Sequence, residues 1–186
     1  MDKIVSRTKY SRKQHRDFYF FHMFFRNRTT VFVIVVALFV VGWAIYNSTK
    51  LTDPNQIMTS WILAAFTVMI TPLLMIMKVN DIVRKETKER KESTDTIEVT
   101  KAKITRSIDL VEGKTVIGWN QIEVICETKE YIYIYLAANQ GVFIVKADII
   151  EGSVALFRKL ANNNMKKNKK GKVQYKMYFK EQKNEK

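Results

Sequence analysis

The residues that could perform chemistry are few and scattered. The single cysteine, Cys126, cannot form a disulfide within the chain, and no CxxC pair or Cys/His cluster supplies zinc ligands. The two histidines, His15 and His22, lie near Asp17 in a basic segment, but neither a nucleophile nor a set of metal ligands accompanies them. The sequence therefore predicts no catalytic residue, no metal and no cofactor, and we expect a protein that is not an enzyme.

Two short motif matches are explained by chance. Residues 111–115, VEGKT, end like a phosphate-binding loop, but the position of the first glycine is occupied by Ile108. Residues 6–9 have the form S-x-x-K without the companion motifs of a serine acyl enzyme. Cys126 alternates within a predicted strand, so we expect it to be a small buried apolar side chain.

Apolar residues are concentrated in two blocks within the first 79 positions. Residues 29–48 carry no charge, and neither do residues 57–77. As a helix, each block is at least roughly 30 Å long, which is the thickness of the hydrocarbon core of a bilayer. Pro72 lies inside the second block, but neighbouring groups in a membrane can satisfy the backbone carbonyl that it frees. We expect two transmembrane helices joined by an extracytoplasmic loop at 49–56.

The distribution of Lys and Arg predicts the orientation. Residues 1–28 contain eight of them and residues 78–92 contain six, whereas the connecting segment 47–56 contains only Lys50. Because basic flanks remain on the cytoplasmic side, we expect a multi-pass protein with both termini in the cytoplasm.

The remaining charge is uneven. The formal net charge is +14, yet residues 93–157 are mildly acidic and the tail, residues 164–186, is basic. We expect a flexible tail and, at 1–28, a basic aromatic segment at the interface; a tail that is merely solvated is the alternative. Anionic lipid headgroups are a possible partner because a tethered tail always has the membrane within reach, and nucleic acid is an unlikely one. The candidate lipid contacts are Arg12, Lys13, Arg16, Arg26, Arg28, Lys166, Lys167, Lys169, Lys170 and Lys172.

Periodicity predicts the elements after the second apolar block. Opposite charges four residues apart favour a charged stalk helix over 78–92. From Thr96 the apolar residues alternate, which is typical of strands, and an amphipathic helix follows, with Asp148 and Glu151 at capping spacing. Two predicted strands lie within 96–110, and four more lie at 115–119, 122–127, 131–136 and 142–145, with a turn at 111–114. Residues 173–180 alternate again, as an added strand, a partner-binding strand or a membrane-surface tag.

These elements predict a membrane α-helical hairpin followed by an α+β cytoplasmic domain at 93–163, a small antiparallel barrel or sandwich closed by the C-terminal helix. Trp119 either fills the core or marks the mouth of a ligand site. Tyr131, Tyr133 and Tyr135 share one face of a strand, as a docking face or as packing beneath the helix. Together with Trp119 they form the candidate partner face.

The order of these features resembles the YcxB-like family of small bacterial membrane proteins. The resemblance rests on an aromatic segment at 17–20, two spans, the pattern W-x-x-I-E-x-I-x-E-T-x-x-Y-I-Y-I-Y-L from Trp119, and F-I-V-K ending at Lys146. It covers most of 17–163 and implies a bacterial cell membrane location and a domain similar to the pleckstrin-homology (PH-like) fold, a bent barrel without established catalytic residues. Family members tend to have Pro where this chain has Val145.

Two functions follow as expectations. The first is a non-enzymatic, membrane-anchored adaptor or sensor whose cytoplasmic domain binds a protein partner, another copy of the chain, or lipid. The alternative is an immunity protein that protects the cell from a membrane-active peptide or toxin, in which the outer loop or the spans would be functional and the cytoplasmic domain supportive.

Overall fold

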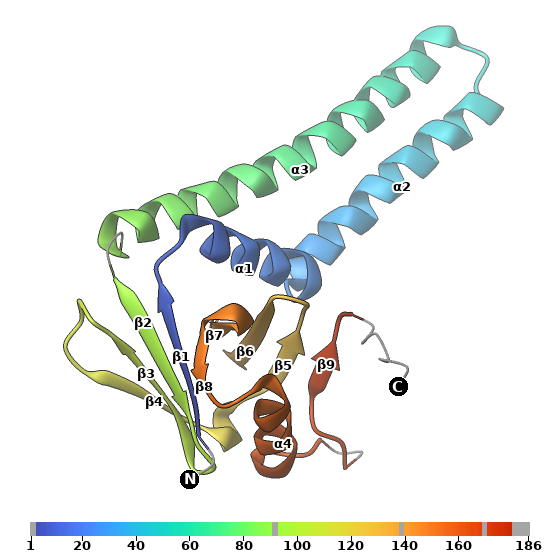
Figure 1. Ribbon diagram of the computed structural model, residues 1–186. Coiled ribbons are helices and arrows are strands. Elements are labelled where there is room, and N and C mark those ends of the chain that lie inside the picture. Colours follow the sequence, from blue (N-terminus) through green and yellow to red (C-terminus); the bar gives the residue numbers. More distant parts are fainter. Residues whose placement is uncertain (1–2, 91–92, 138–139, 169–170, 180–186) are drawn as a thin grey trace, which may run out of the picture. The chain divides into compact units, whose positions relative to one another are not determined.

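A computed structural model describes residues 3–90, 93–137, 140–168 and 171–179 (Figure 1). The chain divides into two compact units. The helical unit comprises residues 12–89, and the strand-rich unit combines residues 1–11 with residues 90–186. The helical unit is thus inserted into the sequence of the other, between its first and second strands.

The helical unit consists of α1 (Arg12–Phe25), α2 (Arg28–Lys50) and α3 (Pro54–Arg90). α2 and α3 are long and apolar enough to cross a membrane, and only 11% of the most apolar window of each is buried. At about 1.5 Å per residue, α2 is roughly 35 Å long and α3 roughly 55 Å. α3 runs without interruption through Pro72 and through the expected stalk as far as Arg90.

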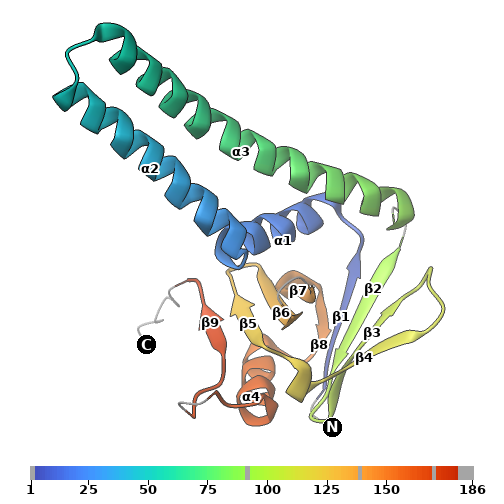
Figure 2. The same cartoon turned by 180° about the vertical axis from the view of Figure 1, so that it is seen from behind.

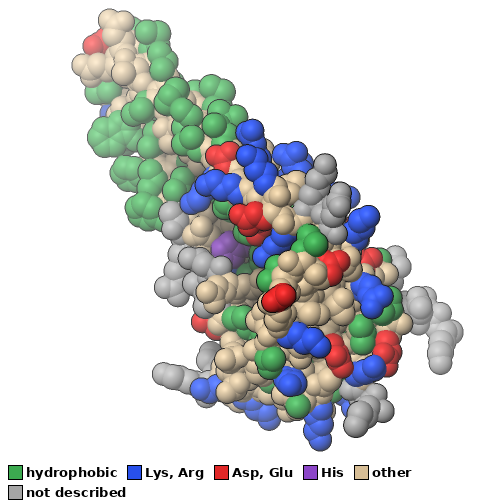
Figure 3. Space-filling model, turned by 90° about the vertical axis from the view of Figure 1, so that its left-hand side faces the viewer, with side chains coloured by type: hydrophobic (Ala, Val, Ile, Leu, Met, Phe, Trp, Pro, Cys, Tyr) green, Lys and Arg blue, Asp and Glu red, His purple; other side chains and the backbone are tan. Residues whose placement is uncertain are grey.

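Contacts at both ends hold the helical hairpin together. Near the connecting loop, the Trp61 indole donates a hydrogen bond of 2.8 Å to the hydroxyl of Ser48. At the other end α1 packs on α3: Met23 is buried against Val79 and Val83, and the Tyr19 hydroxyl donates a hydrogen bond of 2.7 Å to Glu86. Figure 3 shows apolar side chains along the hairpin, and Lys and Arg side chains gathered where this apolar surface ends.

The strand-rich unit contains two sheets (Figures 1 and 2). The first has the order β4-β3-β2-β1-β8, all antiparallel, and the second has the order β7-β6-β5-β9. In the second sheet β9 is parallel to β5, while the other pairs are antiparallel. The strands are β1 Ile4–Lys9, β2 Thr94–Val99, β3 Lys103–Ile108, β4 Lys114–Gly118, β5 Val124–Glu127, β6 Tyr131–Ala137, β7 Gln140–Val145, β8 Ile149–Glu151 and β9 Tyr175–Met177.

One apolar core joins the two sheets to α4 (Val154–Asn164). It receives Ile97 and Ile104 from the first sheet, Ile132 and Ile144 from the second, and Phe157 from the helix. Short 3-10 turns, η1 (Trp119–Gln121) and η2 (Lys146–Asp148), connect the sheets. The expected closed barrel is wrong, because no strand of one sheet pairs with a strand of the other within the described ranges.

The placement of the N-terminal residues corrects the sequence prediction. We expected residues 1–28 to form one interfacial segment, but Ile4–Lys9 is a strand between β2 and β8, with Ile4 opposite Val99 and Lys9 opposite Thr94. The residues of β1 that point inward are Ile4, Ser6 and Thr8. Two of these three are polar, so apolar alternation did not mark the strand.

Two expected boundaries also shift. The terminal helix begins at Val154 rather than Asp148, because Gly152 has a φ of +84°. Ser153 is the N-cap and accepts a hydrogen bond from the Leu156 amide. We also expected the strand alternation to reach Leu110, but β3 ends at Ile108, and Leu110 is exposed in the turn before β4. The turn at 111–114 is confirmed: Gly113 has a φ of +104°.

The basic tail is partly structured. The Gly171 amide donates to the Asn168 carbonyl, and the segment after Lys172 adds β9 to the edge of β5, with the Ile125 amide donating to the carbonyl of Gln174. Of the interpretations considered for residues 173–180, the added strand is confirmed for Tyr175–Met177. Residues 169–170 and 180–186 lie outside the described residues.

Gly152 provides a test of the contact between β8 and β1. A Cβ at Gly152 would lie 2.8 Å from the carbonyl oxygen of Lys3, whereas a Cβ at Gly113 would meet no atom within 4 Å. Both glycines have positive φ, so alanine strains the backbone at both, and the difference isolates the overlap with β1. We expect Gly152→Ala to lower the free energy of unfolding by about 1–3 kcal/mol more than Gly113→Ala.

The measurement is urea unfolding of the full-length protein in detergent. Trp119 fluorescence monitors the unfolding, and Trp43 and Trp61 are replaced with Phe so that Trp119 is the tryptophan observed. Equal losses of unfolding free energy in the two variants would show that Gly152 does not pack closely against β1.

Candidate functional site

Glu127 is a charged residue at the end of a strand whose other members are apolar. Val124, Ile125, Cys126 and Glu127 are all buried, and the Glu127 side chain has no exposed surface. Its partner across the ladder is Ile132, so it faces the same side of the sheet as the core residues Ile125 and Ile134. A carboxylate in this position requires partners, because burying an unpaired charge is costly.

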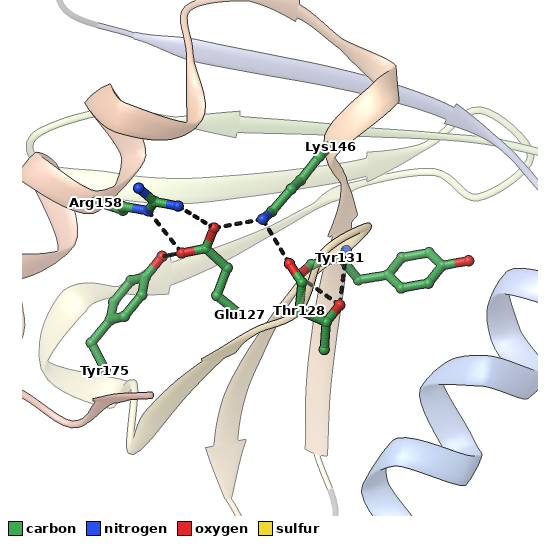
Figure 4. A network of polar contacts seen from close by, with 6 residues as sticks. All are labelled: Glu127, Thr128, Tyr131, Lys146, Arg158 and Tyr175. Atoms are coloured by element: carbon green, nitrogen blue, oxygen red, sulfur yellow. Dashed lines mark hydrogen bonds and ion pairs between the residues drawn. The ribbon is translucent and has the colours of Figure 1, made fainter. Parts of the chain in front are cut away.

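Three side chains from three elements supply these partners (Figure 4). The Arg158 guanidinium, on α4, donates to both carboxylate oxygens, at 2.9 Å from Nε and 2.8 Å from Nη2. The Lys146 ammonium lies 2.6 Å from Oε1, and the Tyr175 hydroxyl, on β9, donates to Oε2 at 2.6 Å. Lys146 also donates to the Thr128 carbonyl and lies 4.5 Å from the centre of the Phe179 ring.

Electrostatics keeps this carboxylate ionised. Burial alone would raise the pKa of Glu127, but the hydrogen bonds from Arg158, Lys146 and Tyr175, with the charge of Lys146, outweigh burial and lower that pKa. Burial, and then the hydrogen bond to Glu127 and its charge, raise the pKa of Tyr175. A carboxylate that stays ionised with both oxygens occupied is a poor proton acceptor. The Glu127 cluster therefore joins β5, η2, α4 and β9 and holds them in place.

Sequence reasoning missed this cluster. Its one local signal was a carboxylate within the apolar pattern of residues 122–127. Arg158 and Tyr175 lie 31 and 48 residues away in sequence, so nothing local indicated that they would converge.

The β3–β4 hairpin exposes apolar side chains at a sheet edge that no described strand covers. β4 is an outer strand of its sheet, and Lys114, Thr115 and Val116 are all exposed. Leu110 and Val111, in the turn before β4, and Val116 on the strand each have more than half of their surface exposed. Figures 1 and 2 show this hairpin at the outer side of its sheet. An exposed edge strand with apolar side chains is a surface onto which another chain can pair.

Trp119 belongs to the core. It is buried, its indole donates a hydrogen bond of 3.0 Å to the Thr100 carbonyl, and its ring lies 6.4 Å from that of Phe157.

The three tyrosines of β6 lie side by side on one face of the strand, as expected, but they are buried. Tyr131, Tyr133 and Tyr135 retain 7%, 2% and 0% of their surface. The Tyr131 ring stacks on Tyr133 at 5.6 Å and meets Phe143 edge-on at 6.2 Å. This row lies on the face of the sheet opposite to Glu127.

The candidate lipid-binding cations fall into two groups in different units. Arg12, Lys13 and Arg16 are exposed on α1, and Arg26 follows that helix half-buried. Lys166, Lys167 and Lys172 are exposed around the turn before β9. Arg28 begins α2, but its side chain, like Lys169 and Lys170, lies outside what the structure describes.

The histidines form no metal centre with other described residues: no group of three or more His, Cys, Asp or Glu side chains converges there. His22 lies against the Phe18 ring, with centroids 6.5 Å apart. Burial and the charge of Arg26 lower the pKa of His22.

Comparison with known proteins bears on the strand-rich unit. Residues 112–161 match the YcxB-like protein family, which confirms the resemblance seen in the sequence. The match begins in the β3–β4 turn and ends in α4, so it includes Glu127, Lys146 and Arg158 but not Tyr175. No curated protein and no solved structure matches the chain.

Removing the charge of Glu127 should destabilise the strand-rich unit. We expect Glu127→Gln to lower the free energy of unfolding by about 3 kcal/mol, because the half-buried Lys146 and Arg158 would be left without their counter-charge. Glu123→Gln, an exposed carboxylate on the same segment, should change stability by less than about 0.5 kcal/mol. The same Trp119 fluorescence measurement compares them, and equal stability of the two variants would contradict the structural role of the cluster.

The stability contributed by Glu127 should depend on pH. Because its pKa is lowered in the folded state, the contribution is complete above the ordinary glutamate pKa of about 4.3 and is lost as the pH falls through the lower folded value. The difference in unfolding free energy between the wild type and Glu127→Gln should therefore be constant near neutral pH and shrink below about pH 4. A difference that stays constant down to the acid limit would show that Glu127 is not the titrating group.

Proposed function

We propose that this YcxB-like protein is a non-enzymatic adaptor of the bacterial cell membrane, anchored by α2 and α3, whose PH-like strand-rich unit binds a protein partner in the cytoplasm. The exposed edge of β4, with Leu110, Val111 and Val116, carries this proposal. The membrane anchor and the partner surface are supported by separate observations.

The helical unit supports the anchor. A soluble helix buries an apolar stripe, but the apolar windows of α2 and α3 are almost entirely unburied. Several Ser and Thr side chains bond back to their own helices: Thr59 donates to the Asn55 carbonyl, and Thr67 donates to the Leu63 carbonyl. Such helices satisfy their own polar groups and leave apolar surface for lipid.

Strand pairing supports an even number of membrane crossings. Lys9 pairs with Thr94 across the β1–β2 ladder, so the two ends of the intervening segment lie on the same side of any membrane. Two crossings, by α2 and α3, meet this requirement, and a single crossing does not. The excess of Lys and Arg in residues 1–28 and 78–92 supports a cytoplasmic location for both ends.

The free edge supports a protein partner. The other outer strand of the same sheet, β8, is three residues long, whereas β4 has five residues and continues from an apolar turn. Backbone pairing supplies affinity for an added strand, and side chains such as Val116 supply selectivity. The exposed cations of α1, Arg12, Lys13 and Arg16, are suited to anionic headgroups and add lipid contacts to the same protein.

The test is site-specific photo-cross-linking in intact cells of the native host. A photoreactive amino acid replacing Val111 should yield a discrete adduct with one cytoplasmic protein, and a Val116→Lys substitution in the same chain should abolish that adduct. A charged residue at a strand edge blocks pairing with another strand. The photoreactive residue in place of Ile150, which is comparably exposed on β8, is the matched control and should yield no such adduct.

Each variant is first shown to remain in the membrane fraction after alkaline carbonate washing. Adducts that persist with Val116→Lys, or that form equally from position 150, would overturn the partner surface. A photoreactive residue at Thr52, between α2 and α3, tests the form of the immunity alternative in which that loop is functional, and adducts from Thr52 would favour it.

A further inference from the structure

We propose that the helical unit holds one acyl chain of an anionic phospholipid in a groove between α1, α2 and α3, with the lipid headgroup at Lys78. The inference goes beyond the adaptor role, and it rests on the membrane anchoring that the adaptor role assumes.

The groove is a defined hollow of about 240 Å³ within the helical unit. Nearly all of its lining is apolar, and Thr71 is the polar exception. The lining comes from all three helices: Phe24 of α1, Ile34, Ala37, Leu38 and Val41 of α2, and Val68, Thr71, Pro72 and Met75 of α3. The Thr71 and Pro72 positions lie within the apolar block of α3, so the groove is at the depth of lipid chains rather than of water.

The chemistry of the walls selects a hydrocarbon occupant. A groove without polar partners cannot hold ordered water, and one left empty would lose the dispersion contacts of its lining. Lipid chains are the apolar molecules present at that depth. Another transmembrane helix is a poorer fit, because helices approach one another through small residues, whereas Leu38, Met75 and Phe24 are bulky.

Lys78 adds charge complementarity at one end of the groove. Thr71, Met75 and Lys78 follow the spacing i, i+4, i+7, so Lys78 continues the face of α3 that lines the groove. It lies one helical turn beyond Met75, about 4.5 Å along the helix axis, where the apolar block ends. Lys78 is exposed and forms no ion pair with another described residue. Its ammonium group is therefore placed for a phosphate whose acyl chain enters the groove.

The test uses the full-length protein in vesicles of phosphatidylcholine and phosphatidylglycerol that contain a trace of phospholipid with a diazirine in its acyl chain. After illumination, mass spectrometry locates the adducts along the chain. We expect adducts concentrated on the peptide that contains Val68 and Met75. Ala37→Phe should fill the groove and reduce these adducts to the level of the outward faces. The matched control Val35→Phe adds similar bulk to an exposed position of α2 outside the groove lining and should leave them unchanged.

The headgroup is tested by comparing phosphatidylglycerol and phosphatidylcholine probes. The wild type should give about fivefold more adduct with the anionic probe, because one lysine near an anionic lipid contributes about 1 kcal/mol. Lys78→Gln should remove this preference, and Lys88→Gln, an exposed cation further along α3, should retain it.

The possible results distinguish failure of the lipid groove from failure of the membrane anchoring on which it rests. Adducts spread evenly along α2 and α3, or unchanged in Ala37→Phe, would overturn the groove while leaving the anchor in place. A preference for the anionic probe that survives Lys78→Gln would overturn the assignment of the headgroup. Adducts in no segment of the chain would overturn both the groove and the anchor.

Discussion

The strand-rich unit depends on the neutralisation of one buried carboxylate. Glu127 has no exposed surface, and an isolated charge in that position costs several kcal/mol. Its partners come from η2, α4 and β9, so each of these elements must be in place before the charge is satisfied. The hydrogen bond from Tyr175 to Glu127 is one contact that holds Tyr175–Met177, which follow a lysine-rich segment, at the edge of the sheet as β9. The same segment covers Lys146 with the ring of Phe179.

A second constraint is the insertion of the helical unit between β1 and β2. β1 is synthesised first, but its partners begin at Thr94, after both apolar helices. The central strand of the five-stranded sheet is β2, and β1 joins it to β8, so the sheet is incomplete until both ends of the helical unit are brought together. In the proposed membrane arrangement, the β1–β2 ladder fixes both ends of the hairpin on one side.

The two units differ in where their apolar residues lie. The strand-rich unit buries its apolar residues between two sheets and α4, and exposes an apolar patch at the β3–β4 hairpin. The helical unit exposes apolar residues along most of α2 and α3, and its buried apolar residues include a small cluster of Met23, Val79 and Val83. Exposed apolar surface binds a different partner in each unit: in water it favours a protein, and in a bilayer it favours lipid.

The sequence by itself determined the features that depend on local composition. The two apolar helices follow from length and hydropathy, β6 from the alternation YIYIYL, and the turn before β4 from the glycine at position 113. Local pattern could not reveal β1, because Ser6 and Thr8 point inward, nor choose between a closed barrel and two sheets, because closure depends on which distant strands pair. It also could not decide the environment of the tyrosine row, because both faces of β6 carry residues that favour burial. Only the tertiary structure brought Lys146, Arg158 and Tyr175 to Glu127, since a charge buried by long-range packing is satisfied by whichever side chains that packing makes its neighbours.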